Sequence, residues 1–259
     1  MTRDTARLTA GPLFKVPAHA MAAAQLTAPE EFGVDSMSFY VQARSAVLGE
    51  AEPGVVAAAF VWLQPDLIRR ALAEARAVIS TEVAESHWRA AMHRWAIEHL
   101  SDLPDMTRLA DVLRRCVVQA DGAQAPIFSG WRALDTPLDP AAEVLHHMYA
   151  LRELRSSLHA CAVLAQAISP REAVAIRTPW LLEVFGWSSE PSPSLVVPRW
   201  EAAERATDLM MERVFEGLDS GESADLIEGL ERVLAHTGSL WSDDPSSPAT
   251  VPQQPTAPL

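Results

Sequence analysis

Residues 145–167 read LHHMYALRELRSSLHACAVLAQA and contain neither proline nor glycine. A run of this length without a helix breaker predicts one long α-helix. When the run is projected at about 100° per residue, Arg152, Arg155 and His159 fall within the same arc as its leucines. The predicted helix therefore carries three cationic or titratable groups on the face that should pack into the core.

The composition of the whole chain agrees with a helical fold. The 259 residues are 49% apolar but only 7% aromatic, and alanine, leucine, arginine and glutamate are abundant. We predict an all-α protein, a multi-helix bundle with a degenerate helix-turn-helix-like C-terminal half. Its expected parts are an N-terminal helical bundle at 13–120, a C-terminal helical part at 139–236 and a disordered tail at 242–259.

Two stretches outside these helices are expected to lack regular structure. The first dozen residues look untethered, and a helix is expected to begin near Leu13. Residues 121–140 contain several prolines and glycines and form the longest expected interior loop. Asp139 as the cap and Pro140 at the first helical position then begin the long helix.

The segment after the long helix resembles the first half of a helix-turn-helix. Ser169 and Glu172 have the spacing of a capping box, and Pro179 begins a second short helix that is expected to end at Gly186. A DNA-reading motif then requires a third helix for the major groove. Three prolines within residues 188–198 disfavour such a helix, so we expect no binding to DNA.

The charge and cysteine content restrict the possible partners further. The formal net charge is −13, and Lys15 is the single lysine among 21 basic residues, which counts against general affinity for nucleic acid. Cys116 and Cys161 have no spacing typical of zinc sites or disulfide frameworks. The longest apolar run, 55–63, is far shorter than the roughly 20 residues of a membrane span. We therefore expect a cytoplasmic protein without a membrane segment, metal or cofactor.

Several short stretches resemble an actinobacterial family of helical proteins described as "helix-turn-helix, SalK-like", which has a degenerate winged-helix element. The resemblance covers roughly residues 15–235. The stretches that carry it are Ala18-His19-Ala20, Phe39-Tyr40 with Arg44, Ala46, Leu48-Gly49, Val55-Val56 and Phe60, Leu151-Arg152-Glu153 with Arg155 and His159, and Gly186-Trp187-Ser188.

The resemblance implies a role in actinobacterial specialised metabolism, as an enzyme or an accessory protein. The chain departs from the family at two places. Similar proteins carry an acidic residue shortly before the position of His19, where this chain has Val16-Pro17, and they continue past Gly-Trp-Ser into a helix and a wing. The last two helices resemble the dimerisation helices of regulators of the multiple-antibiotic-resistance type, which implies a possible homodimer.

The residues allow different explanations of the arginine pair. Because an unpaired charge in an apolar interior is costly, Arg152 and Arg155 must meet carboxylates, carbonyls or a bound anion. They could pair with acidic residues of neighbouring helices and fix the packing. Alternatively, they could line a small-molecule cavity in which they bind an anionic substrate, His159 transfers a proton and His19 completes the site. The third possibility is that this face points to solvent.

Other polar groups on the long helix suggest no further site. His146, Tyr149 and Glu153 share another side of this helix, which is expected to be solvated. Glu143 and His146 match half of a di-iron ligand pattern, but the chain has no second copy. We therefore predict a small-molecule-binding helical protein. The most concrete form of this hypothesis is an acid/base enzyme that acts on an anionic small molecule. A ligand-responsive helix-turn-helix regulator and a dimeric scaffold without a cavity are the alternatives.

Overall fold

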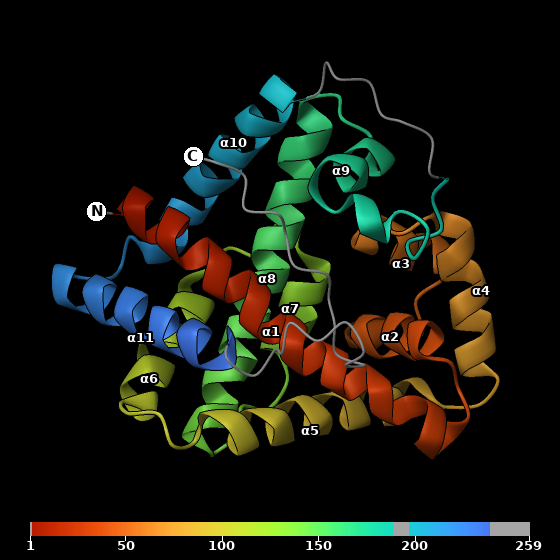
Figure 1. Ribbon diagram of the computed structural model, residues 1–259, viewed down its shortest axis with the longest axis horizontal. Helices are drawn as coiled ribbons and strands as arrows, with labels where there is room; N and C mark the ends of the chain where they lie inside the picture. Colours follow the sequence, from red (N-terminus) through yellow and green to blue (C-terminus); the bar gives the residue numbers. More distant parts are fainter. Residues whose placement is uncertain (1, 189–196, 239–259) are drawn as a thin grey trace.

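The computed structural model describes residues 2–188 and 197–238, and this part of the chain is folded almost entirely into helices (Figure 1). No β-strand occurs within these residues. The predicted all-α fold is therefore confirmed. The predicted tail at 242–259 lies outside the described residues, as does most of the proline-rich stretch at 188–198.

The helices vary in length from three residues to 31. In chain order they are α1 (Thr2–Phe32), α2 (Ser36–Ser45), the 3-10 helix η1 (Ala46–Leu48), α3 (Pro53–Phe60), α4 (Pro65–Arg76), α5 (Thr81–Leu100), α6 (Met106–Gln119), α7 (Pro126–Arg132), α8 (Pro140–Ala165), α9 (Pro170–Arg177), the 3-10 helix η2 (Pro179–Leu181), α10 (Val197–Phe215) and α11 (Ser220–Gly238).

The predicted long helix is α8, and it runs through the middle of the bundle (Figure 1). The Asp139 side chain accepts hydrogen bonds from the backbone N–H groups of Ala141 and Ala142, so this residue is the predicted N-cap. Around α8 pack α1, α5, α6, α7 and α10. Side chains on several sides of α8 are therefore buried, which is unusual for a helix with so many polar residues.

The N-terminal helix differs from the expectation. The first dozen residues are helical, and α1 continues from Thr2 through Pro12, Pro17 and Pro29 to Phe32. Each of these prolines removes a backbone hydrogen bond, which destabilises an isolated helix. However, α1 packs against α5, α8, α10 and α11, and this burial of apolar side chains compensates for the lost hydrogen bonds.

The expected loop at 121–140 also contains regular structure. Helix α7 lies within it, because Ile127, Phe128 and Trp131 recur on one face and are buried against the bundle. The predicted second short helix after Pro179 is only one turn of 3-10 helix. The capping box of Ser169 and Glu172 is confirmed at the start of α9.

A single large core holds most of these helices together. It includes Val16 of α1, Trp88 of α5, Leu151 of α8 and Leu226 of α11, all of which are buried. The core thus draws side chains from the predicted part at 13–120 and from the predicted part at 139–236. Two smaller clusters lie beside it, one around α2, α3 and α4 and one between α8, α9 and α10.

Substitutions in α1 test whether this helix is part of the core. Leu13 is 1% exposed and Leu26 of the same helix is 48% exposed. We expect Leu13→Ala to lower the free energy of unfolding by about 3 kcal/mol, because it leaves a cavity in the core. Leu26→Ala should change it by less than about 0.5 kcal/mol. Urea unfolding followed by circular dichroism measures both, and equal effects would contradict the packing of α1.

Candidate functional site

Arg152, Arg155 and His159 line one cavity of about 460 Å³. They occupy one face of α8, because residues three, four and seven positions apart lie above one another on a helix. The remaining walls come from α1, α2, the turn after α3, α9 with the segment that follows it, and α10. The cavity therefore lies where elements from the whole length of the chain meet.

The charged side chains that line the cavity are predominantly basic. Among the described residues, the lining contains six basic side chains and two carboxylates. The carboxylates are Glu204 and Asp208, both on α10. The basic residues are Arg7, Lys15, Arg44, Arg152, Arg155 and Arg177. In a chain with a net charge of −13, this concentration of positive charge provides a local attraction for anions.

A buried ion network forms the floor of the cavity. The Glu153 carboxylate accepts hydrogen bonds from Arg44 Nε at 3.1 Å and Arg44 NH2 at 2.6 Å, and from Arg152 NH1 at 2.6 Å. Burial alone would raise the pKa of Glu153, but the two guanidinium groups and their hydrogen bonds outweigh it and lower the pKa. Arg44 also donates to the Tyr40 hydroxyl oxygen at 3.1 Å. The hydrogen bonds between Arg44 and Glu153 connect α2 to α8.

Arg155 contacts two carboxylates of α10, those of Glu204 and Asp208. Its NH2 donates to Glu204 Oε2 at 3.4 Å, and its NH1 lies 3.0 Å from Asp208 Oδ1. Burial raises the pKa of Glu204, although Arg155 and Arg177 oppose this effect. The arginine therefore has both carboxylate partners and a cavity beside it.

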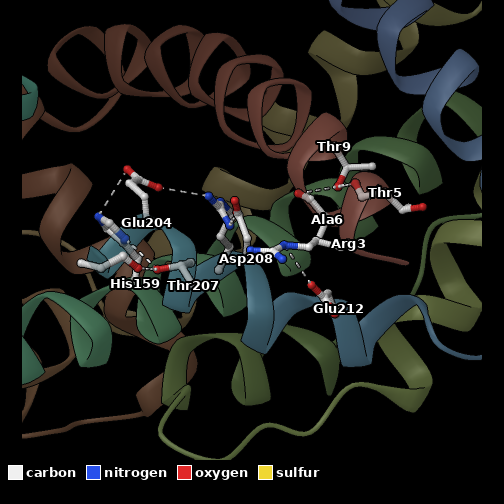
Figure 2. A network of polar contacts seen from close by, with 11 residues as sticks. Arg3, Thr5, Ala6, Thr9, His159, Glu204, Thr207, Asp208 and Glu212 are labelled. Carbon is white, nitrogen blue, oxygen red and sulfur yellow. Dashed lines mark hydrogen bonds and ion pairs between the residues drawn. The ribbon is translucent and has the colours of Figure 1, made fainter. Parts of the chain in front are cut away.

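The hydrogen bonds of Thr207 fix the tautomer of His159. The Thr207 hydroxyl donates its single hydrogen to the Ala203 carbonyl oxygen at 2.8 Å. Its oxygen must then accept from His159 Nδ1, which lies 2.9 Å away. In the neutral ring, the hydrogen is therefore on Nδ1 and the lone pair is on Nε2. Figure 2 shows His159 with Thr207 and Glu204 of α10 close to it.

The environment of His159 keeps its ring neutral. Burial and, to a lesser degree, Arg155 and Arg177 lower the pKa of His159 from 6.5 to about 4. Nε2 lies 4.0 Å from Glu204 Oε1, which is beyond hydrogen-bond distance. At neutral pH this nitrogen is thus a proton acceptor at the wall of the cavity.

Aromatic side chains give the cavity an apolar surface. The His159 ring contacts the indoles of Trp62 and Trp200, with centroid distances of 5.8 and 5.0 Å. The Trp62 backbone carbonyl accepts a 2.7 Å hydrogen bond from Trp187 Nε1. Trp187 follows Gly186, whose φ of 81° favours glycine. The Gly186-Trp187-Ser188 stretch thus helps to fix the position of Trp62, which lines the cavity.

The fourth predicted site residue, His19, lies elsewhere. It is absent from the described residues that line the cavity, and its ring contacts Trp95 of α5, with 6.4 Å between the ring centroids. Although α1 packs against α8, the residues of α1 that reach the cavity lie between Arg7 and Lys15. Burial and the charge of Lys15 lower the pKa of His19 to about 4. We leave His19 out of the candidate site.

The polar side of α8 that was expected to be solvated is instead buried. His146, Tyr149 and Glu153 are 2%, 0% and 1% exposed. His146 Nδ1 lies 3.3 Å from His93 Nε2, and its backbone carbonyl accepts from the Trp131 indole. The reason is that α8 is surrounded by other helices, so its polar groups must find partners within the bundle.

Sequence reasoning missed most of the cavity outside α8. Glu204 and Asp208 lie on α10 and Arg7 lies in the stretch that was expected to be untethered. Arg44 was noted only as part of the family resemblance. The sequence gives no clear signal for its burial, because α2 mixes serine and glutamine with its apolar residues.

Residues 6–192, well over half of the chain, match a family described as a helix-turn-helix family. The chain belongs to this helix-turn-helix family. No curated protein and no solved structure matches the chain.

In this helix-turn-helix family member, the segment from α9 to Trp187 contributes one wall of the cavity. The lining residues of this segment are Ala173, Val174, Arg177, Thr178, Leu181 and Phe185. Within residues 2–188 and 197–238, no three potential ligand side chains are grouped as a metal site. None of the helices described there has the length and hydrophobicity needed to cross a bilayer.

Replacement of Glu153 tests the ion network. Glu153→Gln keeps the size of the side chain but leaves Arg44, whose side chain is 4% exposed, without its counter-ion. We expect the free energy of unfolding at pH 7 to fall by about 3 kcal/mol. Because the pKa of Glu153 is lowered in the folded state, its contribution is present above the usual 4.5 and is lost as the pH falls below it.

Urea unfolding from pH 7 to pH 3 checks both expectations. The matched control is Glu201→Gln, since the Glu201 side chain is 64% exposed. If Glu153→Gln and Glu201→Gln lower the free energy of unfolding by the same amount, the buried network does not stabilise the fold.

The pH dependence of stability tests the environment of His159. The folded pKa of about 4 is below the ordinary 6.5, so the unfolded chain binds the proton first as the pH falls. Stability should therefore decrease from about pH 6.5 to pH 4, and His159 should account for on the order of 2 kcal/mol at pH 5. Urea unfolding of wild type and His159→Gln at pH 7 and 5 measures the difference. An identical pH dependence of both proteins would contradict it.

Proposed function

We propose that this helix-turn-helix family member binds a small organic anion with a flat apolar body in the cavity formed by α1, α8, α9 and α10. The observation that carries the proposal is the lining itself, in which six basic side chains and several aromatic rings face one space. Basic groups hold a carboxylate or phosphate, and aromatic surface binds a planar body. A cavity of about 460 Å³ has the size of ordinary small-molecule sites.

The basic residues differ in their availability to a ligand. Arg44, Arg152 and Arg155 already contact carboxylates of the protein. Arg7, Lys15 and Arg177 line the cavity with side chains that are exposed to solvent, and Arg177 also acts electrostatically on Glu204 and His159. Exposed charges of one sign at a cavity entrance attract oppositely charged ligands from solution, and this attraction weakens with salt. The exposed basic residues therefore attract anions to the cavity, and Arg44, Arg152 and Arg155 orient the bound anion.

We also propose that His159 accepts a proton from the bound ligand, with the arginines stabilising the negative charge that develops. Support for this role comes from the fixed tautomer, which directs the lone pair of Nε2 away from Thr207. With a pKa of about 4, His159 is deprotonated at neutral pH but is a weak base, so proton transfer to it requires that the arginines also lower the pKa of the ligand proton. In line with the family resemblance, we place this chemistry in cytoplasmic specialised metabolism of an actinobacterium.

The family membership supports a second function, that of a ligand-responsive transcriptional regulator. The net charge of −13 and the use of one face of α9 in the cavity disfavour it. A gel-shift experiment with the DNA upstream of the protein's own gene distinguishes the two functions. A specific shift that a ligand abolishes would favour the regulator.

Binding of 2-naphthoate tests the proposed preference for anions. We expect isothermal titration calorimetry to show at least tenfold tighter binding of 2-naphthoate than of its methyl ester, because only the acid carries a charge. Lys15→Ala should weaken binding of the acid and leave the ester unchanged, because Lys15 is an exposed cation that lines the cavity. Arg205→Ala is the control, since Arg205 is exposed on α10 outside the cavity. Equal affinity for acid and ester would refute the proposal.

Exchange of an acidic C–H proton tests the role of His159. Phenylpyruvate combines a carboxylate, an aromatic ring and an enolisable methylene group. We expect the protein to accelerate deuterium exchange at this methylene by about 100-fold, which is the lower range for a positioned base. Proton NMR in deuterated buffer follows the reaction. His159→Gln should abolish the acceleration but retain binding; unchanged exchange in this variant would exclude His159 as the base.

A further inference from the structure

The two ends of the cavity differ in charge. At the end near α2, Arg44 and Arg152 share the single carboxylate of Glu153, so one positive charge is left over from this network. At the end near α10, Arg155 contacts both Glu204 and Asp208, and Arg177 also acts electrostatically on Glu204 and His159. Both carboxylates that line the cavity are thus at one end. Arg155 and Arg177 balance these two carboxylates, whereas the α2 end keeps one excess positive charge. An anionic group of a ligand is therefore favoured at the α2 end.

The hydrogen-bonding groups at the α2 end also suit an anion. The Tyr40 hydroxyl accepts a hydrogen bond from Arg44 NH1, so its own hydrogen remains to be donated. Tyr40 and Arg152 both line the cavity. A ligand carboxylate at this end meets a hydroxyl donor and a guanidinium group.

The α10 end presents acceptors instead. His159 Nε2 has a lone pair, since the hydrogen of the ring is on Nδ1 and is donated to Thr207. Glu204 Oε1 is a second acceptor and lies 4.0 Å from Nε2, too far for a direct hydrogen bond between them. Two acceptors at this separation suit a group that donates a hydrogen bond, such as a hydroxyl or an amide N–H.

We propose that the ligand of this cavity has two polar ends, an anionic group near Arg152 and Tyr40 and a hydroxyl or N–H donor near His159 and Glu204. The inference rests on the proposed binding of a planar organic anion. Arg152 and His159 are seven residues apart on α8, which corresponds to about 10 Å along the helix axis. The donor therefore lies across the length of the planar body from the anion, and Trp62 and Trp200 beside His159 contact that body.

Three related acids test the placement of the donor. They are 2-naphthoate, 6-hydroxy-2-naphthoate with the hydroxyl at the far end of the rings, and 3-hydroxy-2-naphthoate with the hydroxyl beside the carboxylate. We expect 6-hydroxy-2-naphthoate to bind about tenfold tighter than 2-naphthoate, in the range of one hydrogen bond. The 3-hydroxy isomer should show no gain. A greater gain for the 3-hydroxy isomer, or none for the 6-hydroxy isomer, overturns the inference.

Variants of His159 and Tyr40 test which end of the cavity binds which polar group of the ligand. In His159→Phe the advantage of the 6-hydroxy isomer should disappear, whereas Tyr40→Phe should weaken all three acids by the same factor. Arg205→Ala again serves as the control. If His159→Phe fails to fold by circular dichroism, Thr207→Val replaces it, since loss of the Nδ1 acceptor frees the tautomer and should reduce the same advantage. If the 6-hydroxy isomer still binds more tightly than 2-naphthoate in these variants, His159 does not accept the hydrogen bond of the ligand hydroxyl.

The experiment separates this inference from the proposed function. If no naphthoate binds, the proposed binding of organic anions fails. If all three acids bind equally and more tightly than the methyl ester, the proposed function stands and only the placement of the donor is wrong.

Discussion

The ion network of Arg44, Glu153 and Arg152 is the interaction on which the candidate site depends. Glu153 is 1% exposed and accepts from both arginines, so α2 and α8 are joined by charges that are almost completely removed from water. Such a network is stable only if each member keeps its partners, because a lone charge in this environment is very costly. It therefore fixes the floor of the cavity and holds Arg152 and Tyr40 at one end of it.

The other polar groups of the cavity also have partners within the protein. Arg155 is balanced by Glu204 and Asp208, and His159 is oriented by Thr207. These contacts leave an acceptor at one end of the cavity and an excess of positive charge at the other. Arg3 at the start of α1 lies 3.8 Å from Glu212 of α10, so an ion pair outside the cavity connects these two helices (Figure 2). The proposed binding of an organic anion by this helix-turn-helix family member rests on this arrangement of side chains around the cavity.

Much of the fold was predictable because the signals for helices are local. The Asp139 cap, Pro140 and the absence of breakers up to residue 165 predicted α8, and Ser169 with Glu172 predicted the start of α9. The errors occurred where distant contacts dominate. The first dozen residues looked untethered in the sequence, yet α1 begins at Thr2. Packing against α5, α8, α10 and α11 stabilises this helix despite its three prolines.

The sequence by itself determined that Arg152, Arg155 and His159 share a face of one helix, since helical periodicity depends on spacing alone. It also determined that these charges need partners. Only the tertiary structure decided which partners they have and that a cavity lies beside them, because Arg44, Glu204 and Asp208 are brought there by helices distant in the sequence. The same packing directed His19 toward Trp95 and buried Glu153, because the direction of a side chain in space depends on how whole helices are arranged.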